Sequence, residues 1–163
     1  MGIDAVRAFL KARAPDIAVI DQASSTATVL EAAAALGVAP GQIAKTLSLR
    51  VGDRVVLVVA AGDARLDNRK VKAALGARPR MLAADEVEQL TGHPVGGVCP
   101  FGLAAPLPIY CDLSLRHFEQ VYPAAGSRTA SVRLSPDRLA GLVDAQWADL
   151  CTSPTPDLNP DPG

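Results

Sequence analysis

Lys45 is the first residue whose type and position could support chemistry. It is one of four lysines in the chain and lies in the run Ala44-Lys45-Thr46-Leu47, where a turn leads into a strand. An ammonium group flanked by apolar residues could bind a phosphate or polarise a carbonyl. The alternative is a solvated lysine on the polar face of a half-exposed strand. The position by itself favours this alternative.

The glycine-rich loop Gly96-Gly97-Val98-Cys99-Pro100-Phe101-Gly102 is the second candidate. Paired glycines allow close approach of a backbone, and successive free N–H groups can form a nest for an oxyanion or a carboxylate. An ordinary tight connection is the alternative. The Cys99 thiol could act as a nucleophile, but His93, its nearest histidine in sequence, has no evident orienting partner. We therefore expect no nucleophilic role for Cys99.

A cluster of basic residues follows the apolar strand pattern. It comprises Arg65, Arg69, Lys70, Lys72, Arg78 and Arg80, with Asp63 and Asp67 as the acids beside it. A local positive face on a nearly neutral chain suits phosphate contacts. A solvated helix surface explains the same cluster equally well.

The chain as a whole limits the class of protein. Its 163 residues fit one domain, and a formal net charge of −1 argues against binding nucleic acid through bulk electrostatics. Apolar runs are too short to span a membrane, and the N-terminus lacks a secretory signal pattern. Three cysteines without CxxC spacing argue against a disulfide framework or a zinc site. We therefore expect a cytoplasmic protein with no metal, no cofactor and no membrane contact.

The helices and strands that must position these residues can be predicted from hydrophobic periodicity and from the positions of Gly, Pro and capping residues. Helices are predicted at about 3–14, 28–37, 69–75 with Asn68 as cap, 85–90 and 135–143, and strands at about 17–20, 43–50, 55–61, 109–113, 120–122 and 129–134. The run 55–61 is continuously apolar and should be a central strand. Residues 1–150 thus predict one α+β domain with a mixed, largely antiparallel sheet and flanking helices. Residues 151–163, rich in Pro and Asp, are expected to form a disordered tail.

Taken together, four landmarks in order resemble the YbaK/EbsC family, the free-standing editing domains related to the insertion domain of prolyl-tRNA synthetase. The resemblance runs from about Asp21 to Val143. The landmarks are Leu30-Glu31-Ala32-Ala33 through Leu36-Gly37, Ala44-Lys45-Thr46-Leu47, Val95-Gly96-Gly97-Val98-Cys99-Pro100-Phe101-Gly102 and Val121-Tyr122-Pro123-Ala124-Ala125-Gly126-Ser127-Arg128. The resemblance overturns the solvated interpretation of Lys45 and implies a YbaK-like fold.

The resemblance also implies an activity. Members of the family hydrolyse the ester of wrongly charged tRNA, typically tRNA(Pro) carrying Cys or Ala, and some act on Ser- or Thr-charged tRNA. Lys45 matches the essential lysine, which would grip the acceptor-end phosphate or orient the ester. Gly96 and Pro100 match the ends of the GxxxP loop, whose backbone would cradle the aminoacyl group. Water, the terminal ribose hydroxyl or a substrate thiol would attack, with no metal and no protein nucleophile.

Further residues follow from the same resemblance. Thr46, Gly97, Val98, Cys99 and Ser131 would contact the substrate, and Arg65, Arg69, Lys70 and Lys72 could contact tRNA phosphates. Some members carry an acidic residue where Ser131 falls, so a hydroxyl there could alter substrate choice. The partner would be the acceptor end of a mischarged tRNA, with a synthetase as a second partner. A non-catalytic module that binds tRNA or an aminoacyl ligand in the same pocket is the alternative.

Overall fold

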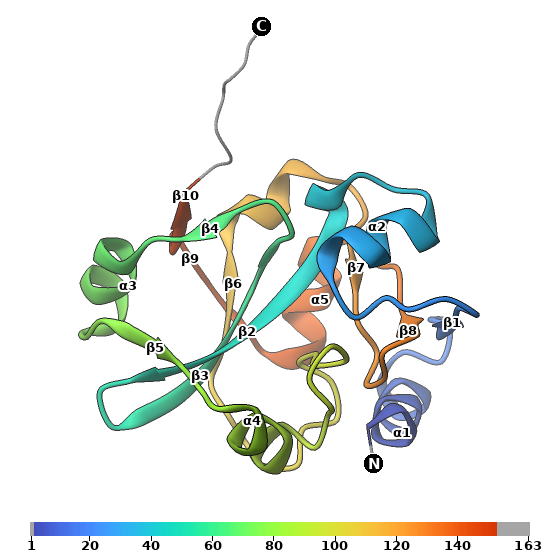
Figure 1. The fold of residues 1–163 in the computed structure, drawn as a ribbon, viewed down its shortest axis with the longest axis horizontal. Helices are drawn as coiled ribbons and strands as arrows, with labels where there is room; N and C mark the ends of the chain where they lie inside the picture. Colours follow the sequence, from blue (N-terminus) through green and yellow to red (C-terminus); the bar gives the residue numbers. More distant parts are fainter. Residues whose placement is uncertain (1, 153–163) are drawn as a thin grey trace, which may run out of the picture.

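The centre of the fold is a long β-hairpin. A computed structural model of the chain describes residues 2–152. In it β2 (Ile43–Val51) and β3 (Arg54–Ala61) pair antiparallel from Ala44 to the end of β2 (Figure 1). Gly52, at a φ of 62°, turns the chain between them, a backbone conformation that glycine adopts without steric cost. From Val56 onward β3 is buried, so the predicted central strand is confirmed.

The hairpin extends into a six-stranded sheet, and the predicted mixed sheet is confirmed. The sheet order is β5-β2-β3-β6-β9, and β7 also pairs with β2. The added strands are β5 (Pro79–Met81), antiparallel to β2; β7 (Tyr122–Pro123), parallel to β2; β6 (Ile109–Asp112), parallel to β3; and β9 (Gln146–Ala148), parallel to β6. Two short antiparallel pairs lie outside it: β1 (Ile20–Asp21) with β8 (Ala130–Ser131), and β4 (Arg65–Leu66) with β10 (Cys151–Thr152).

Five α-helices flank the strands in the described part of the chain. They are α1 (Ile3–Arg13), α2 (Val29–Leu36), α3 (Asn68–Leu75), α4 (Ala84–Thr91) and α5 (Pro136–Val143), with 3₁₀ turns η1 (Pro40–Gln42) and η2 (Leu113–His117). Side-chain caps explain where α2 and α5 begin: the Thr28 hydroxyl accepts from Glu31 N, and the Ser135 hydroxyl accepts from Arg138 N. None of the helices within residues 2–152 is both long and apolar enough to cross a bilayer.

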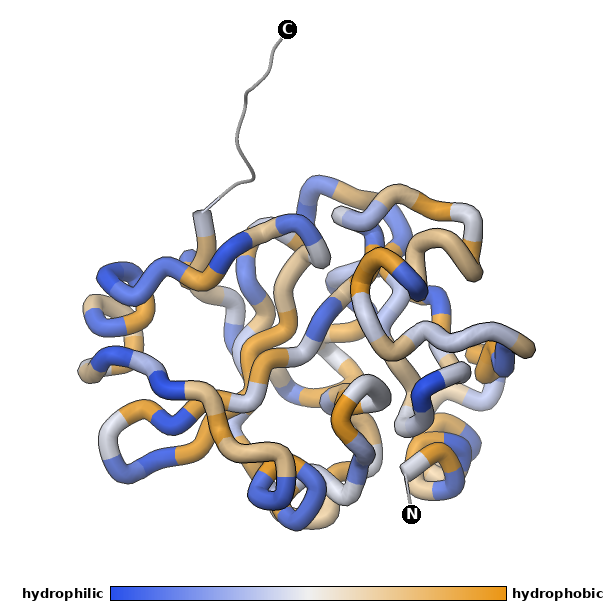
Figure 2. The backbone as a smooth tube through the Cα atoms, in the orientation of Figure 1, coloured by the Kyte–Doolittle hydropathy of each residue, from blue (hydrophilic) through white to orange (hydrophobic). Residues whose placement is uncertain are grey.

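Apolar side chains form separate cores on the two faces of the sheet. The larger core joins α1 and α5 to the sheet through Val6, Leu10, Leu57, Val59, Phe101 and Leu139. The second core packs α3 against the other face through Leu49, Val56, Val58, Val71, Tyr110 and Leu150. Figure 2 shows the result as orange stretches along the central strands and alternating colours along α3 and α4. β3 is therefore packed on both faces, whereas the middle of β2 is only half-buried.

Some sequence expectations need correction. In the segment expected as a strand at 17–20, only residue 20 pairs, because the strand is the two-residue β1. The cap of α3 is Asp67, whose carboxylate accepts from Arg69 N and Lys70 N, and not Asn68. Cys151 and Thr152 form β10, so the folded part continues past residue 150. The rest of the expected tail, 153–163, lies outside the described residues.

Candidate functional site

A pocket of about 300 Å³ opens along one edge of β2. Its walls come from the start of α2, the first half of β2, the segment from β5 into α4, the glycine-rich loop and the strands β7 and β8. Figure 1 shows α2 beside the start of β2, with β5 and α4 toward its other end. Of the residues expected at the site, Lys45, Thr46, Gly96, Val98 and Ser131 line this pocket.

The pocket lies where β2 has no neighbouring strand within residues 2–152 on the side that faces away from β3. β7 pairs with β2 only at Ile43 and Ala44, and β5 pairs only from Leu49 to Val51. Between them, Leu82 N donates to Ser48 O at 3.2 Å. Because backbone groups of alternate strand residues point to the same side, the N–H and C=O of Thr46 face this open edge as Ser48 O does. An extended ligand could bind these groups much as a strand would.

Buried polar side chains line the same edge, and one of them has no hydrogen-bond partner among the described residues. The Thr46 hydroxyl is buried and has no hydrogen-bond partner within residues 2–152. Ser131 and Ser48, also in the lining, are buried. Most of the remaining wall is apolar, including Val29, Met81, Val87 and Val98. A buried hydroxyl without a partner costs free energy, and a bound polar ligand would remove that cost.

Lys45 is anchored by a turn that follows β3. Its half-buried ammonium donates to Ala64 O and, at 3.2 Å, to Gly62 O. A lysine ammonium has three N–H donors, so one remains for a ligand. Burial lowers the pKa of Lys45, the nearby Asp63 carboxylate opposes that shift, and the Arg65 guanidinium lowers the pKa further. Lys45 is thus a partly desolvated cation in the pocket lining.

The glycine-rich loop is pressed against the segment that follows β7. Gly96 has a φ of 91°, and a Cβ built there would lie 2.9 Å from Ala27 Cβ. A Cβ on Gly97 would lie 2.6 Å from Ser127 N. Gly97 N donates to Pro94 O and Gly97 O accepts from Gly126 N, so both of its backbone groups are occupied. The two glycines are therefore required for close approach of two backbone segments.

Three of the expected loop residues do not line the pocket. Gly97, Cys99 and Pro100 are buried outside its lining, and Pro100 borders a different hollow beside Phe9 and Arg13. Burial raises the pKa of the Cys99 thiol to about 12. Such a thiol carries almost no thiolate at neutral pH, as the sequence interpretation of Cys99 requires. These three residues therefore pack behind the pocket wall and do not face the pocket.

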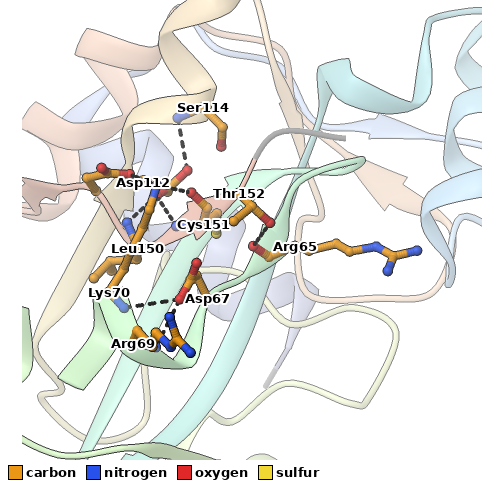
Figure 3. Close-up of polar contacts among 10 residues, drawn as sticks. Arg65, Asp67, Arg69, Lys70, Asp112, Ser114, Leu150, Cys151 and Thr152 are labelled. Atoms are coloured by element: carbon orange, nitrogen blue, oxygen red, sulfur yellow. Dashed lines mark hydrogen bonds and ion pairs between the residues drawn. The ribbon is translucent and has the colours of Figure 1, made fainter. Parts of the chain in front are cut away.

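The basic residues do not form one surface over the pocket. Lys70 Nζ donates to Asp149 at 3.0 Å and to Cys151 O at 2.9 Å (Figure 3). Arg69 and Lys72 border a separate hollow on α3. Arg65, in β4, is close enough to Lys45 to affect its pKa, and Figure 3 shows its side chain extending away from Arg69 and Lys70. Of these four basic residues, only Arg65 affects the pKa of Lys45.

The sequence reasoning missed one side of the pocket. Thr26, Met81, Leu82, Val87 and Tyr122 line it, and none was singled out as a site residue. Apolar residues at these positions look like ordinary core or strand residues in sequence. The signal that could have found Met81 is its flanking pattern, because Pro79-Arg80-Met81 precedes α4 as a short extended run.

Comparison with known proteins agrees with this architecture. Residues 23–142 match the aminoacyl-tRNA editing domain. The chain is 48% identical over 130 residues to the uncharacterized protein YwhH of Bacillus subtilis, covering 78% of this chain and 83% of that protein. It is 31% identical over 123 residues to EbsC of Enterococcus faecalis, a proposed Cys-tRNA(Pro)/Cys-tRNA(Cys) deacylase, covering 74% of each.

A solved structure supports the same relationship. It is described as a proposed trans-editing enzyme for prolyl-tRNA synthetase, and it superposes with a TM-score of 0.86 at 36% identity. The match covers 93% of this chain and 97% of that one. The match at residues 23–142 spans more than half of the chain and includes β2, the glycine-rich loop and all but the last residue of α5. The chain therefore belongs to the family of aminoacyl-tRNA editing domains.

Proposed function

We propose that the protein is a deacylase that hydrolyses the ester of mischarged tRNA, with tRNA(Pro) carrying Cys, Ala, Ser or Thr as the substrate class. The observation that carries the proposal is the pocket at the open edge of β2, which combines a partly desolvated Lys45 with an unpartnered Thr46 hydroxyl. Its volume of about 300 Å³ suits a small aminoacyl group.

The proposed chemistry depends on positioning. An aminoacyl ester is already activated, so holding a nucleophile in line supplies much of the acceleration. Lys45 would grip the acceptor-end phosphate or orient the ester, and the outward N–H of Thr46 would donate to the developing oxyanion. One such donor is worth about 3 kcal/mol. Water, the terminal ribose hydroxyl or a thiol on the substrate would attack, without a metal, a cofactor or a protein nucleophile.

The proposed partner is the acceptor end of tRNA, reached in the cytoplasm, where tRNA is charged. Arg65 supports this contact because its charge lies near Lys45. Arg69 and Lys72 could contact phosphates farther along the tRNA. A synthetase would be a second partner, as the description of the solved relative implies for that protein.

The test is a panel of Ala-, Cys-, Ser- and Thr-charged tRNA incubated with the wild-type protein and with Lys45→Ala. We expect hydrolysis of at least one member and a loss of about 100-fold or more in Lys45→Ala, comparable to removal of a key electrostatic group. Lys11→Ala, which removes an exposed lysine of α1, is the matched control. Thermal melting of each variant separates lost activity from lost folding.

The pocket lining also supports the second candidate, a non-catalytic binding module. No aspartate, glutamate or histidine belongs to the lining formed by the described residues. A binding module predicts saturable binding of the charged tRNA that Lys45→Ala abolishes, with no release of amino acid. Failure to hydrolyse any member of the panel would therefore reject the deacylase and leave the binding module to be judged by its affinity.

A further inference from the structure

We propose that Asp112 is a positioning residue for Lys45, because its buried carboxylate holds both ends of the turn that seats the Lys45 ammonium. The turn is Gly62-Asp63-Ala64, between β3 and β4. The inference deepens the proposed function, since it assigns a role in the same site to a residue that lies outside the pocket lining.

The turn presents its carbonyls to Lys45 in a fixed arrangement. Gly62 O and Ala64 O both accept from Lys45 Nζ, and Ala64 N donates to Ala61 O at 3.0 Å. A Cβ built on Gly62 would lie 2.2 Å from Pro40 O. The turn therefore packs directly on η1, and the ammonium is seated only while the turn keeps this position.

One oxygen of the Asp112 carboxylate fixes the entrance to the turn. Asp112 lies at the end of β6, and its Oδ2 accepts from Ser114 N at 2.9 Å. The Ser114 hydroxyl in turn accepts from Ala61 N at 3.1 Å. Ala61 is the last residue of β3 and immediately precedes the turn. The link thus runs from the carboxylate through η2 to the residue before Gly62.

The other oxygen fixes the exit. Asp112 Oδ1 accepts from Leu150 N at 2.7 Å and from Cys151 N at 3.0 Å. Cys151 then pairs with Leu66 and Thr152 pairs with Arg65, so β10 holds β4 directly after the turn. Figure 3 shows Asp112 among Ser114, Leu150 and Cys151, with Arg65 on the neighbouring strand.

The chemistry of this clamp requires a carboxylate. Asp112 is 2% exposed, and its two side-chain oxygens together accept three backbone N–H groups. An asparagine has one carbonyl oxygen, and its NH₂ group would face an N–H donor at either the entrance or the exit. Asp112→Asn therefore releases one end of the turn while keeping the size of the side chain.

The experiment measures the pKa of Lys45 directly, in full-length protein with ¹³C-labelled lysine. The four lysines give few Cε signals, and the signal missing from Lys45→Ala assigns the one of interest. Burial lowers the pKa of Lys45 in the wild-type protein. In Asp112→Asn we expect that pKa to shift by at least half a unit, because a loosened ammonium changes both its burial and its hydrogen bonds to Gly62 O and Ala64 O. We also expect kcat/KM for the hydrolysed tRNA to fall at least tenfold.

Two further variants keep the test decisive. Ser114→Ala breaks only the entrance link and should shift the Lys45 pKa in the same direction by less, which tests the proposal even where Asp112→Asn fails to fold. Val6→Ala removes two methyl groups from the core under α1, away from the turn, and reports loss of stability alone.

The outcomes separate the two proposals. An unchanged Lys45 pKa in folded Asp112→Asn or Ser114→Ala, or an activity loss no larger than in Val6→Ala, would overturn the positioning role. A wild-type protein that hydrolyses no charged tRNA rejects the proposed function alone. The pKa measurement then still decides whether Asp112 positions Lys45.

Discussion

Two walls of the pocket are built in opposite ways. The edge of β2 at Thr46 has a buried hydroxyl without a partner and backbone groups with no strand opposite them. The glycine-rich loop is closed: Gly97 packs on the Ser127 backbone, and Cys99 is fully buried, as is His93 just before the loop. The hydrogen-bonding capacity left for a ligand therefore lies on the strand edge, while the loop acts as a rigid support.

This difference shows that residue type alone misleads about where chemistry occurs. The loop contains the residues that look reactive, but the Cys99 thiol has a pKa raised to about 12 by burial. His93 Nε2 lies 2.7 Å from Phe101 O and 3.6 Å from Cys99 Sγ, within the protein interior. Lys45 and Thr46, on a plain strand, line the pocket, whereas Cys99 and His93 do not.

The largest effect on this comparison is expected from Gly97→Ala. A Cβ there would lie 2.6–2.8 Å from Ser127 backbone atoms, which cannot move without shifting the loop. We expect the free energy of unfolding to fall by about 3 kcal/mol, the upper range for overpacking. Denaturant titration measures the change.

Gly141→Ala is the matched control for this substitution. Gly141 lies within α5, and a Cβ there would meet nothing within 4 Å. The alanine should raise the free energy of unfolding by about 0.5–1 kcal/mol, because glycine is a poor helix residue. Equal tolerance of alanine at positions 97 and 141 would mean that the loop is not closed.

Removing one hydroxyl group from each of two threonines tests the same difference, and the expected effects on stability are intermediate in size. Thr91 donates to Val87 O at 2.6 Å and accepts from His93 N at 3.1 Å, whereas the Thr46 hydroxyl has no partner among the described residues. Thr91→Val should lower the free energy of unfolding by about 1–3 kcal/mol, since it leaves a buried N–H unsatisfied. Thr46→Val should change it by less than about 0.5 kcal/mol.

The effects of these two substitutions on kcat/KM should follow the reverse order. A hydrogen bond to the ligand is worth about 1 kcal/mol, so Thr46→Val should reduce kcat/KM about three- to tenfold. Thr91→Val should leave kcat/KM near the wild-type value at temperatures where the variant is folded. A large stability loss in Thr46→Val would show that its hydroxyl already has a partner, and the open edge would then be a wrong description.

Much of the fold was predictable because the signals are local. The apolar run 55–61 and the turn at Gly52 specify the hairpin without reference to anything distant. The starts of α2 and α5 follow from Thr28 and Ser135, whose hydroxyls cap within three residues. Lys45 and Gly96 were found through the order of motifs along the chain, and both line the pocket.

The features that the sequence did not predict depend on pairs of residues that lie far apart in the chain. β4 and β10 have two residues each and exist because Leu66 meets Cys151 across more than 80 positions. No periodicity can develop over two residues, so the pattern carries no signal. Asp112 looks like a surface acid at a strand end, and only its distance to Leu150 N shows that it is buried and fully bonded.

The smallest expected effect is a pH dependence of stability that comes from His93. Burial lowers the pKa of His93 below its ordinary value of 6.5, and its Nδ1 has no hydrogen-bond partner in residues 2–152 that could stabilise an added proton. The unfolded chain binds that proton more readily, so stability is complete above about pH 6.5 and falls as the pH drops below it. Denaturant titrations between pH 7 and pH 5 should show this decrease in the free energy of unfolding.

Two histidine substitutions assign this pH dependence. His93→Gln should reduce it, and His117→Gln, at an exposed position, should retain it. An unchanged pH dependence in His93→Gln would mean that the loop interior admits a charge and is more open than its packing indicates.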